Sequence, residues 1–181
     1  MELLDTILNR RSVREYKEQM VPEELINDLL KAGAAAPSAM NLQPCRFIVI
    51  TNKGKIRELS DKVKMQGGLL GAAGKYAEHF KLKEDVIFYG APLLIFIAAE
   101  KNDWSAIDCS LAAQNMMLRA RDLELGSCFI GFASMLNNDR ETLRGIGITD
   151  SQELCCPLIF GYPKRWPHPK IREPKVQKRV D

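Results

Sequence analysis

Three arginines and a serine stand close together in the stretch NRRSVREY, residues 9 to 16 of this 181-residue chain. They are Arg10, Arg11, Ser12 and Arg14. A guanidinium fork matches two phosphate oxygens at once, and a serine hydroxyl can hold a neighbouring alcohol. The stretch therefore fits an anion clamp.

A solvated helix end is the alternative interpretation of the same stretch. Apolar residues recur at helical spacing just before it, at Leu3, Leu4, Ile7 and Leu8. Cations in the last turn of a helix suit the negative end of its dipole. The arginines alone do not decide between the two interpretations.

The segment APSAMNLQP, residues 36–44, has a proline near each end and three polar side chains between them. Ser38, Asn41 and Gln43 offer hydrogen-bond donors and acceptors on a backbone that the prolines stiffen. Amide side chains on a rigid turn suit the imide edge of a flat heterocycle. A plain connector between a helix and a strand is the alternative.

Two further segments carry features that suit a ligand. GSCFIG, residues 126–131, ends a predicted strand at Gly131, where exposed N–H groups would let a ligand approach closely, unless it is only a tight turn. The basic, proline-rich tail carries Lys164, Arg165, Lys170 and Arg172. These cations either complete a phosphate site or keep the tail in solution.

Other common chemistries find little support. His79 and His168 are the only histidines and lie far apart, which argues against a metal centre and a Ser/His/Asp triad. The five cysteines have no CxxC spacing, which argues against a zinc site or a disulfide framework and favours the cytoplasm. No side chain is predicted as a nucleophile, so the pattern favours chemistry carried by a bound organic cofactor.

Length and composition predict one globular domain, with 46% hydrophobic and 27% charged residues. A net charge of +3 without an aromatic ladder does not favour nucleic acid as a partner. The amino-terminal residues are acidic and the longest apolar run is strand-sized, so we expect no membrane segment.

The hydrophobic pattern predicts a mixture of helices and strands. Helices are expected over residues 2–9, 21–36, about 55–64, 77–89 and 106–123, with the last covered on more than one side. Strands are expected over residues 45–51, 93–99, 127–132 and 154–160. The region from Lys53 to Tyr89 gives the weakest pattern.

From Leu4 to Arg172 the chain resembles the nitroreductase family of FMN-dependent oxidoreductases. Four motifs follow in the family's order: RRSVREY, APSAMNLQPCRFIVI, DCSLAAQNMMLRARDLELGSCFIG and FGYPKRWPHPKIR. The resemblance implies an α+β fold, with a central, mostly antiparallel sheet flanked by helices. It also implies an intertwined homodimer with two FMN molecules at the subunit interface. Many members have tryptophan where this chain has Cys45.

The resemblance also assigns roles to the candidate residues. Arg10, Arg11 and Ser12 would reach the phosphate and ribityl end of FMN, and Arg14 a neighbouring polar edge. Pro37, Ser38 and Ala39 would line the isoalloxazine, while Asn41 and Gln43 would approach the flavin from the partner chain or brace the interface. Ile130 and Gly131 would present a backbone N–H to flavin N5, and Lys170 or Arg172 would close over the phosphate.

The function implied by the resemblance is ping-pong transfer of a hydride from NAD(P)H to flavin N5 and then to a small organic acceptor, such as a nitroaromatic or a quinone. Residues 1–163 would form the FMN-binding domain, and residues 164–181 an extension that wraps on the partner subunit. The alternatives are a non-catalytic FMN storage or sensor protein and a dehalogenating or flavin-fragmenting branch of the family.

Overall fold

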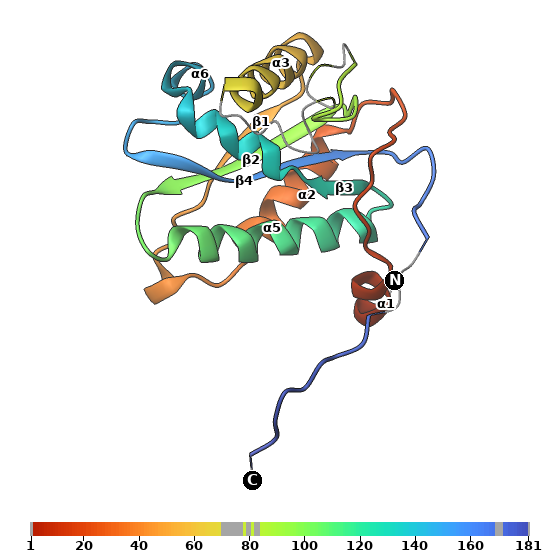
Figure 1. Ribbon diagram of the computed structural model, residues 1–181. Coiled ribbons are helices and arrows are strands. Elements are labelled where there is room, and N and C mark those ends of the chain that lie inside the picture. Colours follow the sequence, from red (N-terminus) through yellow and green to blue (C-terminus); the bar gives the residue numbers. More distant parts are fainter. Residues whose placement is uncertain (1, 70–77, 79–80, 82–83, 169–171, 181) are drawn as a thin grey trace.

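The computed structural model describes residues 2–69, 78, 81, 84–168 and 172–180. Its centre is one sheet of four strands, β1 (Arg46–Ile50), β2 (Leu93–Glu100), β3 (Gly126–Phe129) and β4 (Gln152–Gly161). The order across the sheet is β1-β2-β4-β3 and every neighbouring pair is antiparallel (Figure 1). The predicted α+β class is confirmed, and all four expected strands are present.

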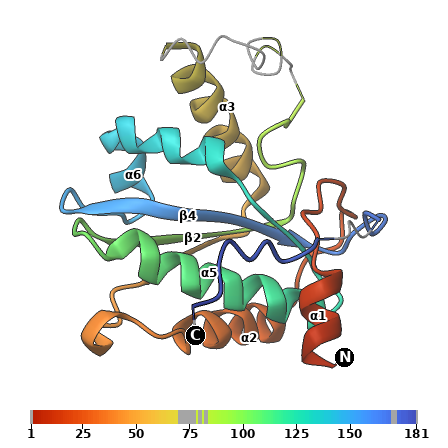
Figure 2. The same ribbon diagram turned by 60° about the horizontal axis from the view of Figure 1, so that its bottom comes forward.

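Helices cover both faces of this sheet, as Figure 2 shows. On one face lie α3 (Lys53–Leu69), the 3₁₀ segment η2 (Gly131–Asn138) and α6 (Arg140–Gly145). On the other lie α2 (Glu23–Ala34) and α5 (Ser105–Asp122), while α1 (Leu3–Asn9) stands beside one end of α5. No helix in the described part of the chain is both long and apolar enough to cross a membrane.

β2 contributes to both hydrophobic cores because its side chains alternate between the two faces. Leu94, Phe96 and Ala98 point to the α3 side, and Leu93, Ile95, Ile97 and Ala99 to the α5 side. All seven are fully buried. A strand covered on both faces reads as one continuous apolar run, which is why APLLIFIAA predicted it.

A bulge in β4 interrupts this alternation. Ile97 pairs with Cys156 but the next residue, Ala98, pairs with Leu154, so Cys155 is left without a partner on β2. An extra residue of this kind bends the strand and redirects its side chains. As a result Leu154 belongs to the core on the α3 side, and Cys155 and Cys156 to the one on the α5 side.

Three predicted boundaries are wrong. The strand expected over residues 127–132 ends at Phe129, because η2 begins at Gly131. The helix expected from residue 55 to 64 extends to Leu69 and contains Gly67 and Gly68. Of the helix expected over residues 77–89, the stretch from Glu84 onward forms bends and turns, and most of the rest lies outside the described residues.

A single carboxylate holds that turn. Asp85 accepts hydrogen bonds from the backbone N–H groups of Ile87, Phe88 and Gly90 at 3.2, 2.8 and 3.1 Å. It also accepts one from the Ser60 hydroxyl at 2.7 Å, which fastens the turn to α3. Four donors converge on one side chain, so an acceptor-only group is required there.

Replacing Asp85 by asparagine should therefore destabilise the protein. The new amide group would face at least one of these N–H donors, and an unsatisfied donor costs about 1 to 3 kcal/mol. We expect the free energy of unfolding to fall by about that amount in a denaturant titration. Glu84→Gln, one residue earlier and exposed, is the matched control. An Asp85→Asn protein as stable as the control would contradict this role.

Two helices carry apolar residues that their own subunit leaves open. The apolar residues of α1 are 70%, 65%, 44% and 57% exposed at Leu3, Leu4, Ile7 and Leu8. On α5, the side chains of Ile107 and Leu111 are 53% and 41% exposed, although Ala112, Met116 and Ala120 are buried. The helix α5 is therefore covered by the sheet, α2 and α1, as expected of a helix covered on more than one side, and still leaves Ile107 and Leu111 open.

Candidate functional site

The segment after α1 lies along the edge strand β3. Ser12 and Ser127 form a parallel bridge, and the Val13 N–H donates to the Ser127 carbonyl at 2.9 Å. The segment is thereby joined to the edge of the sheet by a single bridge. It brings the Arg10–Ser12 group to the strand that leads into Ile130 and Gly131.

Gly126 makes this close approach feasible. A Cβ atom at Gly126 would lie 2.8 Å from both Cβ and Cγ2 of Val13, well inside van der Waals contact. Val13 is 1% exposed and β-branched, so it has little freedom to move aside. The glycine is needed for packing against the arginine segment.

Three guanidinium groups gather here. Burial, followed by the charges of Arg172 and Arg11, lowers the pKa of Arg10 below its usual value. Arg172, from the far end of the sequence, is thus close enough to repel Arg10. Among the described ion pairs none involves Arg10, Arg11 or Arg172. We call these three residues the arginine cluster. Lys170, the other predicted tail residue, lies outside the described residues.

Arg11 caps the carboxy-terminal end of α1, and its Nε–H has no acceptor among the described residues. Its Nη1 donates to the carbonyl oxygens of Leu8 at 2.7 Å and Arg10 at 2.6 Å, as expected of a cation at a helix C-terminus. Its Nε is buried and, within the described part of the chain, has no acceptor. The helix-end interpretation therefore applies to Arg11, and the anion clamp stays a prediction.

Arg14 lies between two pockets. One, of about 290 Å³, is lined by Arg14, Ile87, Tyr89, Phe129, Ile130, Gly131 and Phe132. The other, of about 430 Å³, is lined by Ser12, Arg14, Glu15, Arg165, Trp166, Pro167 and His168. The predicted residues Ser12, Arg14, Ile130 and Gly131 thus border one continuous region. As the first residue of η2, Gly131 has an N–H without an acceptor inside that segment.

Tyr89 also lines the 290 Å³ pocket, and no sequence pattern predicted this residue. Its φ is +56°, an unusual conformation for a side chain of this size. The Asp85 turn imposes it, and the guanidinium carbon of Arg14 lies 5.8 Å from the centre of the Tyr89 ring. Strain of this kind often marks a functional position. No sequence motif indicates it, since the turn depends on a carboxylate that folds back on its own backbone.

The predicted turn over residues 36–44 is held in an unusual conformation. Met40, Asn41 and Gln43 have φ of +49°, +55° and +49°. The Ser38 hydroxyl accepts from the Gln43 N–H at 2.9 Å, and Gln43 Nε2 donates to Asn41 Oδ1 at 3.2 Å. The amide side chains are exposed at the tip of the turn.

Asp108 of α5 anchors this turn. Its two carboxylate oxygens accept from the Ala39 N–H at 3.1 and 3.3 Å, and Asp108 is itself only 4% exposed. Pro37, Ser38, Gln43, Cys45 and Asp108 share the lining of a pocket of about 230 Å³. The sequence analysis missed Asp108 because 69 residues separate it from Ala39.

The structure does not bring the two groups of predicted residues together within one chain. The turn lies at the start of α5, through Asp108, whereas α1 and the arginine segment lie at its other end (Figure 1). A helix of 18 residues spans about 27 Å. Residues 37–43 and the arginine cluster are therefore separated by roughly the length of α5.

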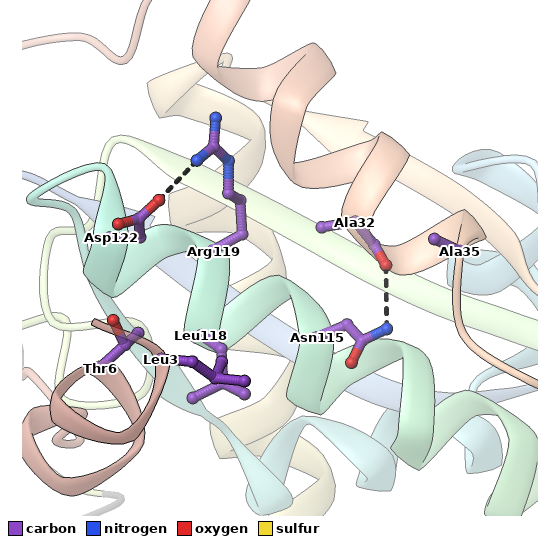
Figure 3. Close-up of a pocket in the computed structure, with 8 residues that line it drawn as sticks. All are labelled: Leu3, Thr6, Ala32, Ala35, Asn115, Leu118, Arg119 and Asp122. Carbon is purple, nitrogen blue, oxygen red and sulfur yellow. Dashed lines mark hydrogen bonds and ion pairs between the residues drawn. The ribbon is translucent and has the colours of Figure 1, made fainter. Parts of the chain in front are cut away.

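Figure 3 shows a fourth pocket, between α1, α2 and α5, at the arginine end of α5. Its polar groups are already paired: Asn115 Nδ2 donates to the Ala32 carbonyl at 3.2 Å, and Arg119 Nη1 to Asp122 at 2.6 Å. Leu3 and Leu118 supply an apolar wall. Within the described ranges, no three histidine, cysteine or acidic side chains are grouped to hold a metal ion.

Comparison with known proteins gives a consistent result. A crystal structure of a nitroreductase with bound FMN from Bacteroides fragilis has 29% sequence identity, covers 99% of this chain and 98% of its own, and superposes with a TM-score of 0.86. One from Desulfitobacterium hafniense, at 23% identity and covering 100% and 99%, shares the fold with a TM-score of 0.89.

A sequence relative extends this result. The FMN reductase (NADPH) of Bacillus subtilis is 30% identical over 179 residues, which cover 95% of this chain and 70% of the relative. The family model described as the nitroreductase family matches residues 7–162, which include β1 to β4 and the whole arginine stretch. The chain therefore belongs to the nitroreductase family.

Proposed function

We propose that the protein is an FMN-dependent oxidoreductase that takes a hydride from NAD(P)H and reduces a small organic acceptor. The observation that carries this proposal is the arginine cluster, which lies along the edge strand β3, while Arg14 of the same segment lines a pocket with Ile130 and Gly131. The family membership and the FMN-bound structure at 29% identity support it.

The residues present fit the phosphate end of FMN. Arg11 and Arg172 both repel Arg10, and a bound dianion would offset that repulsion. The buried Nε of Arg11 offers a donor that has no acceptor among the described residues. These three residues would hold the phosphate, and Ser12 a ribityl hydroxyl. Lys170 stays a further candidate for the phosphate.

Bound FMN would supply the redox chemistry, accepting a hydride at N5 and passing electrons on. The protein's own residues would orient the ring and stabilise the negative charge that grows during reduction. The Gly131 N–H would face N5, and Arg14 would lie near the polar edge of the ring. No side chain of the protein needs to act as a nucleophile or general base.

The pocket beside Arg14 favours flat, aromatic acceptors. Tyr89, Phe129 and Phe132 supply aromatic walls around the Ile130–Gly131 backbone. Such rings stack on one another with a gain of about 0.5 to 1.5 kcal/mol per pair. Nitroaromatics and quinones fit this surface.

We infer that each cofactor site is shared between two subunits. Pro37, Ser38, Ala39, Asn41 and Gln43 lie about one length of α5 from the arginine cluster, so both groups can contact one FMN only if they come from different chains. The apolar residues open on α1, on α5 and at Met40 and Leu42 suit an interface.

The carboxy-terminal extension fits the same arrangement. It starts on its own subunit, where the Lys164 N–H donates to the Glu15 carbonyl at 2.9 Å and Arg165 pairs with Glu15 at 2.7 Å. Residues 172–180 are exposed and run away from the body of the subunit (Figure 1). We propose that residues 164–181 wrap on the partner.

Mixing two defective variants tests the shared site. An Arg10→Ala homodimer and an Asn41→Ala/Gln43→Ala homodimer should each bind FMN weakly at both of their sites. A mixed dimer has one site with both defects and one intact site. We therefore expect FMN binding at about half the wild-type stoichiometry in dimers re-formed from an equal mixture and purified through two different tags.

If the turn and the arginines of the same chain served one site, mixed dimers would contain no intact site. FMN binding would then stay at the level of the parent variants. That result would contradict the proposal that each site is shared between two subunits. The purified mixed dimer also reports whether the chain dimerises at all.

The activity itself is tested by colour. Purified protein should be yellow, and NADH or NADPH should bleach it in the absence of oxygen. Colour without bleaching by either nicotinamide would favour FMN storage or sensing over catalysis. A colourless protein after incubation with FMN would contradict the proposal.

A further inference from the structure

Four cysteines that are scattered in the sequence gather where β1, α5 and β4 meet. Cys45 directly precedes β1, Cys109 lies in the first turns of α5, and Cys155 and Cys156 lie in β4. The sulfur atoms of Cys45 and Cys109 are 3.7 Å apart. Cys109 also contacts the Cys155 thiol, while Cys156 lies 3.9 Å from the Ser110 hydroxyl.

The Cys45 and Cys109 thiols have different environments. Cys109 is fully buried in the core beneath α5, whereas Cys45 is half-buried and lines the 230 Å³ pocket under the 36–44 turn. A water molecule takes up about 30 Å³ in the liquid, so the pocket has room for a small peroxide. An oxidant in solution would therefore meet Cys45 first.

The pKa values of the two thiols also indicate that Cys45 is the more reactive one. The contact with the Cys109 thiol lowers the pKa of Cys45, and Arg46 lowers it further, although burial and Asp108 oppose this. Contacts with Cys155 and Cys45, together with burial, raise the pKa of Cys109. The thiolate is the reactive form of cysteine, so Cys45 is the nucleophile of the pair.

We propose that Cys45 and Cys109 are a peroxide-reactive pair that closes to a disulfide beneath the 36–44 turn. The Cys45 thiolate attacks one oxygen of hydrogen peroxide, which breaks the O–O bond and gives a sulfenic acid and, with one proton, water. The Cys109 sulfur then attacks the sulfenic sulfur, and the hydroxyl leaves as a second water with the Cys109 proton. Two thiols are oxidised and one peroxide is reduced.

Closure requires the two sulfur atoms to approach from 3.7 Å to the S–S bond length of about 2.05 Å. Cys45 lies at the junction of the turn and β1, where the backbone is not yet paired in the sheet. The bond would tie this end of the turn to α5, one residue from the Asp108 anchor of Ala39. The reaction needs no FMN, so a test on the protein without FMN is independent of the proposed function.

Peptide mapping tests the proposal on the full-length protein. After treatment with hydrogen peroxide and blocking of free thiols, trypsin releases Cys45 in residues 32–46, Cys109 in residues 102–119 and the other two in residues 145–164. We expect a non-reduced species that joins 32–46 to 102–119 and that reductant separates. Peptide 102–119 has no other cysteine, so this link cannot form in Cys109→Ala, where Cys45 should accumulate as a sulfinic acid instead.

Cys155→Ser is the matched control, because it removes the third thiol and leaves the pair. It should form the linked species in wild-type yield. The proposal would be overturned by a link between 102–119 and 145–164 in the wild type. It would also be overturned by peroxide treatment that leaves Cys45 a free thiol, or that over-oxidises it as readily in the wild type as in Cys109→Ala.

Discussion

Replacing Arg10 by alanine is expected to weaken FMN binding by about 10- to 150-fold. Arg10 lies in the arginine cluster, where its pKa is lowered by burial, Arg172 and Arg11. A hydrogen bond to a charged group contributes about 1.5 to 3 kcal/mol, which corresponds to that range of affinity. A fluorescence titration of FMN with the apoprotein measures the change.

The same replacement should leave the apoprotein as stable as the wild type or make it slightly more stable. Removing the guanidinium group of Arg10 relieves its repulsion by Arg11 and Arg172 in the folded state. The rise in thermal midpoint on adding FMN should shrink, since it depends on affinity. A loss of FMN affinity without a loss of apoprotein stability would show that Arg10 binds the ligand and is not needed for the fold.

Arg144→Ala is the matched control for charge. Arg144 lies on α6 and pairs with Asp150 at 3.0 Å on the surface, away from β3. We expect wild-type FMN affinity in this variant. Equal losses in the two variants would mean that net charge, not the cluster, governs binding.

Replacing Gly126 by alanine should destabilise the fold and weaken FMN binding together. The new Cβ would lie 2.8 Å from Val13, so the segment that carries Arg10, Arg11 and Ser12 would have to shift away from β3. Overpacking of this kind costs about 1 to 3 kcal/mol, or about 2 to 12 °C in thermal midpoint for a chain of this size. Calorimetry at a fixed subunit concentration and the FMN titration measure both effects.

Two further variants decide whether the contact with Val13 is the cause. Gly145→Ala adds the same methyl group where nothing lies within 4 Å, and should change stability by no more than about 1 kcal/mol. Val13→Ala removes Cγ1 and Cγ2, two of the three atoms that the new methyl meets, and leaves Cβ, so the double variant should recover part of the FMN affinity that Gly126→Ala loses. No recovery would mean that Gly126 acts in another way.

The sheet and its covering helices could be predicted from the sequence because burial leaves a local pattern. β2 and β4 read as apolar runs of strand length, and α2 begins after Pro22 with acidic residues in its first turn. The predicted boundaries fail where tertiary contacts override local preference. The α3 helix continues through Gly67 and Gly68, and β3 stops at Phe129 where η2 starts.

Much of the candidate site depends on contacts between distant residues. The sequence indicated the arginine stretch and the turn, but not that Asp108 holds the turn or that Asp85 sets the conformation of Tyr89. The cysteines gave no local spacing, yet the fold brings Cys45 within 3.7 Å of Cys109. The apolar stripe of α1 was visible, but not that its residues stay largely exposed.

Native mass spectrometry of the protein after incubation with excess FMN tests the central claim most directly. The account predicts a dimer that carries two FMN molecules, and a loss of FMN but not of the dimer in Arg10→Ala. A bare polypeptide, whether monomer or dimer, in the wild-type sample would contradict it.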